Sequence, residues 1–137
     1  MIHQLSMYFD LWLWTSSLKD YADLLIDNYI DPEKKYLKRR FYRESCINVS
    51  GSLYIKDIGI FSNMKPENLI IVENQLISFS SCMGNGYLCD SYIDAPDDQE
   101  LLTITNFFLA VKDEPDLRAP LADMFHFTQC LEYINKK

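Results

Sequence analysis

The sequence is poor in the residues that build metal centres and disulfide frameworks. Its 137 residues contain two histidines and four cysteines, and no two cysteines form a Cys-x-x-Cys pair. A structural zinc site needs four closely spaced ligands of these types, so we expect no zinc site. We interpret the cysteines as free thiols of a reducing compartment inside the cell, with nuclear, cytoplasmic and mitochondrial locations left open. The four are Cys46, Cys82, Cys89 and Cys130.

Long apolar runs and an excess of positive charge are also missing. No segment approaches the roughly 20 apolar residues of a membrane span. No charged N-terminal stretch precedes an apolar one, which predicts no signal peptide. The net charge is −7, and the one basic cluster, between Lys34 and Arg40, is interpreted as a solvated helix end and loop. The sequence therefore predicts no direct membrane insertion and no nucleic-acid partner, because phosphate contacts need clustered Lys and Arg.

What the sequence does contain is an alternation of strand and helix patterns. The apolar run Phe9–Trp14 predicts a buried strand, and apolar residues recur at helical spacing over Leu18–Tyr29. Ser17 with Asp20 three residues later predicts a capping box, and Pro32 ends the helix. With 48% hydrophobic residues, the chain can form one domain with a real core.

The alternation of predicted strands and helices continues toward the C-terminus. Leu69–Val72 is expected to be a strand buried on both faces of a parallel sheet, because it is uncharged and rich in β-branched residues. The alternation predicts an α/β fold with a mainly parallel sheet. The other predicted elements are a strand at Arg39–Tyr42, a hairpin formed by Ile47–Val49 and Leu53–Ile55, a helical turn at Asp57–Phe61, a turn at Gly84–Gly86, a strand at Tyr87–Cys89, a helix after Asp98 that runs to Val111, and a final helix within Asp116–Phe127, which requires Pro120 to lie in its first turn.

Polar residues follow the predicted strands where ligands bind in open α/β sheets, at the carboxyl ends. Thr15, Arg43 and Lys56 are suitable phosphate ligands. Glu73 and Asn74 offer the carboxylate and amide oxygens that magnesium accepts. An alternative stays open for the two cations: each forms a salt bridge instead, with a nearby carboxylate such as Glu44, Asp57 or Glu73.

Several of these segments together resemble the small C-terminal-domain phosphatases, or NLI-interacting-factor-like proteins, of the haloacid-dehalogenase superfamily. The resemblance runs from about Leu5 to about Arg118. Its motifs, in order, are residues 9–23 (FDLWLWTSSLKDYAD), 43–46 (RESC), 54–57 (YIKD), 67–74 (ENLIIVEN), 85–86 (NG) and 97–102 (DDQELL).

This resemblance implies a three-layer α/β sandwich with a small β-hairpin insertion. It also implies a magnesium-dependent phosphatase acting on phosphoserine or phosphothreonine in proteins. Thr15, Arg43 and Lys56 would bind the transferring phosphoryl group, and Asn74 would support the magnesium ion together with the residue at position 73. In this family an aspartate attacks phosphorus, and a second aspartate two residues later acts as acid and base.

The sequence departs from the family at the catalytic centre. No two aspartates are spaced two apart in the 137 residues, so the nucleophile is absent and no residue is predicted to be catalytic. Glu73 stands where the family has aspartate, and its extra methylene disturbs the narrow geometry of a magnesium shell. We therefore expect residues 1–137 to form a single, N-terminally incomplete phosphatase-like domain with a vestigial phosphate site. It is expected to need no cofactor as it stands, and to need magnesium only if it is active.

The family's nucleophile lies on a central strand, between the strands that match Phe9–Trp14 and Leu69–Val72. Without that strand two apolar edges are left to pair with each other or with another polypeptide. We expect a structural or interaction subunit with a protein partner that supplies the missing strand. The alternatives are part of an active serine/threonine phosphatase, as a fragment or one piece of a split enzyme, and a mitochondrial import-translocase relative of the same fold.

Overall fold

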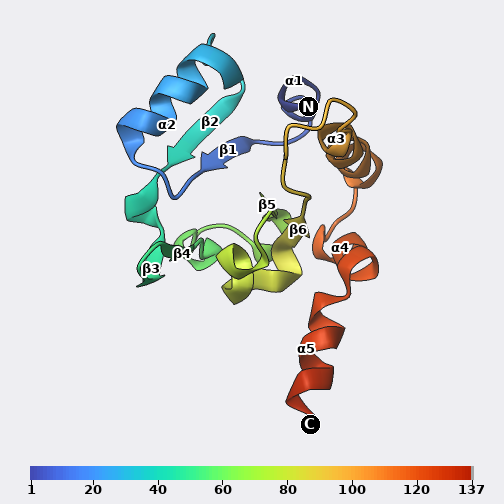
Figure 1. Ribbon diagram of the computed structural model, residues 1–137. Coiled ribbons are helices and arrows are strands. Elements are labelled where there is room, and N and C mark those ends of the chain that lie inside the picture. The colour runs from blue at the N-terminus through green and yellow to red at the C-terminus, as the bar shows by residue number, and fades with distance from the viewer. Residues whose placement is uncertain (137) are drawn as a thin grey trace. The chain divides into compact units, whose positions relative to one another are not determined.

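The computed structural model describes residues 1–136 as a mixed α/β chain (Figure 1). The chain divides into two compact units, Met1–Lys56 and Asp57–Lys137. In the first unit the elements are α1 (Ile2–Leu5), β1 (Leu11–Trp14), α2 (Lys19–Leu25), the π-helical turn η1 (Ile26–Ile30), β2 (Leu37–Phe41), the 3₁₀ turn η2 (Arg43–Ser45), β3 (Ile47–Ser50) and β4 (Leu53–Ile55).

The first unit is built on two parallel strands joined by a helix. β1 pairs with β2, with Trp14 opposite Phe41. Parallel neighbours cannot be joined by a tight turn, and here α2 and η1 form the crossover. The core under the helix consists of Ala22, Ile26 and Tyr42, with Leu13 and Leu37 packed against it.

The predicted strand–helix–strand order of this unit is confirmed, but the predicted capping box is wrong. The helix begins after Leu18, which makes no side-chain cap hydrogen bond. Ser17 instead donates its backbone N–H to the side-chain hydroxyl of Thr15, at 3.1 Å. The hydroxyl after the strand therefore shapes the turn before the helix, and the helix start is left uncapped.

The predicted hairpin is confirmed as the antiparallel pair of β3 and β4. Gly51 at its tip has a φ of +54°, which a residue with a Cβ rarely adopts. The hairpin is thus the small insertion expected after the parallel strands.

The second unit, as described to residue 136, combines one parallel strand pair with three α-helices and several 3₁₀ segments. β5 pairs with β6, and Ile71 lies opposite Gly86. Its core contains Phe79 and Tyr87, and the Tyr87 ring packs on those of Phe108 and Phe125 at centroid distances of 5.6 and 5.1 Å. The elements are η3 (Ile58–Ile60), η4 (Pro66–Asn68), β5 (Ile71–Glu73), η5 (Leu76–Asn85), β6 (Gly86–Leu88), α3 (Glu100–Val111), α4 (Arg118–Phe125) and α5 (Phe127–Asn135).

Three expectations for the second unit need correction. The strand begins at Ile71 rather than Leu69, and Val72 is 43% exposed, so β5 is not buried on both faces. The predicted turn at residues 84–86 is the end of η5 and the start of β6. The chain continues beyond Phe127 as α5, because His126 takes a left-handed φ of 55° and redirects the helix. Pro120 lies in the first turn of α4, as its missing N–H requires.

Over residues 1–136 the strands form three two-stranded sheets, of which two are parallel and one is antiparallel. The α/β class and the parallel pairing are confirmed, while the three-layer sandwich stays a prediction. Among the helices of residues 1–136, none is both long and apolar enough to cross a membrane.

Candidate functional site

The first unit brings Thr15 and Arg43 to the same edge of a parallel strand pair. Thr15 directly follows β1, and Arg43 begins η2 after β2. The backbone N–H of Thr15 donates to the carbonyl of Phe41 at 2.9 Å, and that of Arg43 donates to the carbonyl of Ser17 at 3.1 Å. These two backbone hydrogen bonds therefore connect the two strand ends at the positions of the candidate phosphate ligands.

The Arg43 side chain is held from two sides. Its Nε donates to the carbonyl of Ser16 at 2.7 Å, and its guanidinium lies 5.2 Å from the ring centroid of Tyr54, on β4. Within the described first unit, residues 1–56, no carboxylate forms an ion pair with it. The salt-bridge alternative therefore finds no support for Arg43 within that unit, and the terminal nitrogens of the guanidinium suit an anion.

The hairpin that supports Arg43 also carries Lys56. Lys56 follows β4 directly, two residues beyond Tyr54, and is half-buried. The first unit thus contains all three residues predicted to bind phosphate. Whether Lys56 contacts a phosphoryl group stays a prediction.

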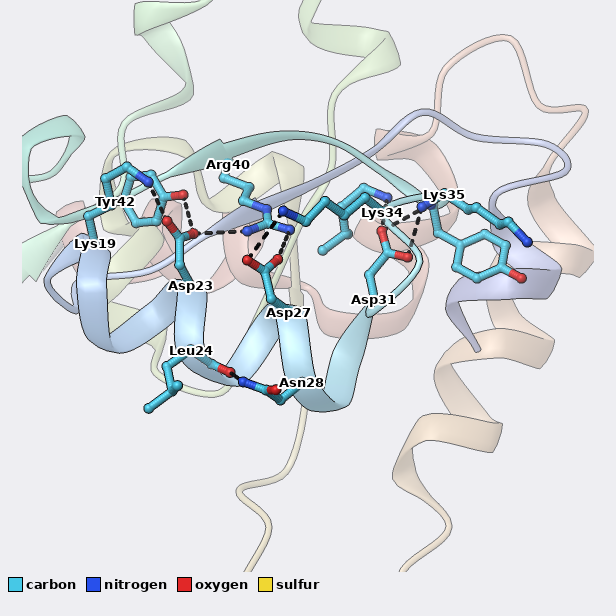
Figure 2. A network of polar contacts seen from close by, with 12 residues as sticks. Lys19, Asp23, Leu24, Asp27, Asn28, Asp31, Lys34, Lys35, Arg40 and Tyr42 are labelled. Carbon is cyan, nitrogen blue, oxygen red and sulfur yellow. Dashed lines mark hydrogen bonds and ion pairs between the residues drawn. The ribbon is translucent and has the colours of Figure 1, made fainter.

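Behind this edge, a network of charged side chains ties α2 to β2 (Figure 2). Arg40 donates to the carboxylates of Asp23 at 2.9 Å and of Asp27 at 2.7 Å. Asp23 also accepts from Lys19 and from the hydroxyl of Tyr42, the latter at 2.6 Å. Hydrogen bonds from Lys19 and then Tyr42 hold the pKa of Asp23 well below its usual range.

This network corrects the interpretation of the basic cluster as solvated. The side chain of Arg40 is 19% exposed, and it is paired with carboxylates one helical turn apart. Lys34 and Lys35, with side chains 67% and 62% exposed, do match the expectation. The signal that could have revealed the network is the spacing of Asp23, Asp27 and Asp31 on one helix face, which Figure 2 shows turned toward β2.

Asp31 is a buried residue at the C-terminal end of the helix formed by α2 and η1. It is 1% exposed, and its two carboxylate oxygens accept the backbone N–H groups of Lys35, Tyr36 and Leu37 at 2.9–3.0 Å. Burial opposes its ionisation, yet the three hydrogen bonds outweigh that penalty and lower the pKa of Asp31. The carboxylate therefore fixes the turn that leads into β2.

Glu73 is the last residue of β5 in the second unit, and Asn74 follows it. The backbone N–H of Asn74 donates to Oε1 of Glu73 at 3.0 Å, and the side-chain amide of Asn74 donates to the hydroxyl of Ser91 at 2.9 Å. Among residues 1–136, no three His, Cys, Asp or Glu side chains are grouped as a metal site. Magnesium bound by protein uses one or two carboxylates in near-ideal octahedral geometry. One carboxylate that accepts the backbone N–H of the following residue and one amide do not fit that requirement by themselves.

The chain matches a family model described as NLI interacting factor-like phosphatase over residues 1–118. It is 32% identical to CTD small phosphatase-like protein 2 of Dictyostelium discoideum, over 95% of this chain and 22% of that protein. It is 32% identical to Nuclear envelope morphology protein 1 of Schizosaccharomyces pombe, over 85% of this chain and 24% of that one. It is 30% identical to CTD nuclear envelope phosphatase 1B of Danio rerio, over 88% and 48%. The chain thus spans less than half the length of each of these relatives.

Proposed function

Because the chain belongs to the NLI interacting factor-like phosphatase family, we propose that it binds the phosphoryl group of a phosphorylated protein and does not hydrolyse it alone. The observation that carries the proposal is the joining of Thr15 and Arg43 at one edge of β1 and β2. The ligand is phosphoserine or phosphothreonine in a protein chain.

The three phosphate ligands have separate tasks. Arg43 offers a planar pair of N–H donors that match two phosphate oxygens. Thr15 already accepts a hydrogen bond from the backbone N–H of Ser17, so its own hydroxyl hydrogen can donate to a third oxygen. Lys56 adds a point charge. These groups neutralise and orient a phosphoryl group, which is the protein's main task in phosphoryl transfer.

Binding without turnover follows from what the 137 residues lack. They contain no Asp-x-Asp pair, so they supply neither the attacking carboxylate nor the acid and base two residues beyond it. The set of Glu73 and Asn74 also falls short of a magnesium site. The chain is therefore proposed to work as a structural or interaction subunit of a phosphatase-like assembly, with no cofactor of its own.

The partner in that assembly is proposed to be a protein that supplies the missing central strand. In the first unit, as far as residues 1–56 describe it, β1 pairs only with β2, and among residues 57–136 β5 pairs only with β6. Each strand thus has a second edge that can accept another strand. A strand that pairs with either edge would extend that two-stranded sheet.

The location is proposed to be the nucleus or its envelope. Of the three compartments left open by the cysteine content, this is the one named in two of the relatives described above. The import-translocase alternative has no corresponding support. Imaging of a fluorescently tagged chain against nuclear-envelope and mitochondrial markers tests the choice.

The central experiment measures binding and turnover on the same phosphoserine peptide. Calorimetry should detect binding that Arg43→Ala weakens by about tenfold, while phosphate release with magnesium stays at background. Arg39→Ala is a matched control, because Arg39 also lies over an aromatic ring, 4.9 Å from the centroid of Trp12. Absence of binding, or equal losses in the two variants, contradicts the phosphate site. If the chain alone releases phosphate and Lys56→Ala abolishes that release, the proposal that the chain does not hydrolyse phosphate by itself is contradicted.

A second candidate is part of an active magnesium-dependent serine/threonine phosphatase, which the names of the relatives favour. Here, adding a separate apolar segment that carries Asp-x-Asp should restore phosphate release. The same segment with both aspartates changed to asparagine is the control. Tight binding of both segments without turnover supports the interaction role instead.

A further inference from the structure

The second unit contains a cleft of about 650 Å³ that the proposed phosphate site does not use. Its lining comes from the segment after β6 and from the first turns of α3. The segment after β6 is irregular from Cys89 to Gln99, and it contributes one of the most exposed aromatic rings of the chain, Tyr92, at 68%. The cleft is therefore a surface feature formed by one continuous stretch of chain.

The lining combines apolar surface with three carboxylates. Tyr92, Leu101 and Leu102 are each more than half exposed and contribute the apolar surface. The carboxylates are Asp90, Asp98 and Glu100.

Two of these carboxylates accept backbone hydrogen bonds, and within the described second unit, residues 57–136, none of the three forms an ion pair with a lysine or arginine. Glu100 accepts the backbone N–H of Asp90 at 3.2 Å, and Asp98 accepts the backbone N–H of Glu100 at 2.9 Å. Two basic side chains of the unit are paired elsewhere, Lys112 with Asp113 and Arg118 with Asp116.

The thiol of Cys89, which also lines the cleft, is affected by the same negative charge. Burial raises the pKa of Cys89, and the carboxylates of Glu100, Glu73 and Asp90 raise it further. The cleft is thus an apolar surface inside a field that favours a cation.

The cleft borders one of the candidate site segments. The backbone N–H of Cys89 donates to the carbonyl of Glu73 at 3.0 Å, and Ser91 accepts the side-chain amide of Asn74. The segment that lines the cleft is therefore fixed to the carboxyl end of β5. A peptide lying in the cleft passes beside the residues that match the family's last motif.

We propose that this cleft binds a lysine- or arginine-bearing segment of the phosphorylated protein. The cationic head lies among Asp90, Asp98 and Glu100, and its aliphatic stem packs on Tyr92, Leu101 and Leu102. A net charge of −7 argues against the other candidate occupants, a nucleic acid, an anionic membrane or a second copy of this chain. The proposal rests on the proposed function only in assigning the basic segment and the phosphoryl group to one substrate.

The test measures the binding of four labelled Gly/Ser peptides by fluorescence polarisation. Two of them carry an arginine and two carry citrulline in its place, and one peptide of each pair also carries a phosphoserine. We expect the arginine peptide to bind even without phosphate, and the citrulline peptide to bind about tenfold more weakly. Changing Asp90 and Asp98 to asparagine and Glu100 to glutamine should erase that difference. Arg43→Ala should remove only the gain due to phosphate.

A matched control changes three exposed acidic residues of the same unit outside the cleft, Glu114→Gln, Asp123→Asn and Glu132→Gln. Equal losses in control and cleft variants would show that net charge alone attracts the peptide, and would overturn the proposal. The carboxylate of Asp98 also accepts a backbone N–H at the start of α3, and that of Glu100 accepts the backbone N–H of Asp90. Tyr92→Ala therefore serves as a second variant, and it should lower arginine-peptide affinity several-fold with an unchanged circular-dichroism spectrum. Peptide binding that depends on the phosphate and not on the arginine would contradict the proposed role of the cleft, and would still agree with the proposed phosphate site.

Discussion

The hydroxyl of Tyr42 donates a hydrogen bond to the carboxylate of Asp23, at 2.6 Å. Tyr42 is the residue immediately before Arg43 in the chain. The bond joins the end of β2 to the middle of α2. Tyr42 is 8% exposed, so the contact also anchors the core of the first unit. The position of Arg43 thus depends on a helix residue that would not itself touch phosphate.

Replacing Tyr42 by phenylalanine removes this hydrogen bond and keeps the ring. Because the acceptor is charged, the free energy of unfolding should fall by about 2 kcal/mol. Phosphopeptide affinity should fall a few-fold, since the backbone at Arg43 is less constrained. Urea unfolding and calorimetry measure the two effects. Tyr29→Phe, on a side chain 79% exposed, is the matched control, and equal changes in both variants would contradict the anchoring role.

Asp31 should make the first unit sensitive to acid. Its folded pKa is lowered, so its contribution to stability is complete above the unfolded value, near 3.9, and is lost as the pH falls through the folded value. The free energy of unfolding should therefore decline below about pH 4. Asp31→Asn should cost about 2 kcal/mol at neutral pH, because an amide accepts at one oxygen only, and should flatten the acid decline. Asp20→Asn, at an exposed position of α2, should do neither.

Arg43→Lys separates charge from shape. Lysine keeps the positive charge but loses the Nε bond to the carbonyl of Ser16 and the flat stacking on Tyr54. Phosphopeptide affinity should fall several-fold, between that of the wild type and that of Arg43→Ala, in calorimetry at constant ionic strength. An affinity equal to that of the wild type would mean that the guanidinium geometry plays no part.

Gly86→Ala tests the packing of the second unit. A Cβ at this position would lie 2.0 Å from the ring of Phe79, which is 0% exposed, so the buried ring or the backbone must shift. We expect a loss of about 3 kcal/mol in the free energy of unfolding, as in severe overpacking. Gly84→Ala is the control, because a Cβ there meets nothing within 4 Å. A loss below 1 kcal/mol for Gly86→Ala would show that the ring has freedom to shift.

Local patterns predicted the first unit well. The apolar run before Thr15, the helical spacing after it and the Ser50–Ser52 turn each specify an element without long-range information. The capping box failed because the helix begins after Leu18, and because the Thr15 hydroxyl accepts the backbone N–H of Ser17 that a capping box would give to Asp20. The Arg40 network was missed because the spacing of Asp23, Asp27 and Asp31 on the helix does not say which basic residue of the neighbouring strand faces them.

The second unit depends more on tertiary packing. Nothing local distinguishes Val72 from Ile71, yet the first is 43% and the second 9% exposed. The cleft before α3 was also missed, because it results from how the segment between Cys89 and Gln99 lies against α3. Of the candidate site, Thr15 and Arg43 lie at the ends of two paired strands. The phosphate-binding roles of Thr15, Arg43 and Lys56 and the metal-binding roles of Glu73 and Asn74 stay predictions.

The two tryptophans of the chain, Trp12 and Trp14, both lie on β1, with their rings 5.8 and 5.7 Å from that of Phe41. The second unit has none and is built around tyrosine and phenylalanine rings. Indole emission, excited selectively at long wavelength, therefore originates in the first unit. A strand that docks on the second edge of β1 would change the surroundings of both indoles, so the arrival of a partner should be visible as a spectral shift without any attached dye.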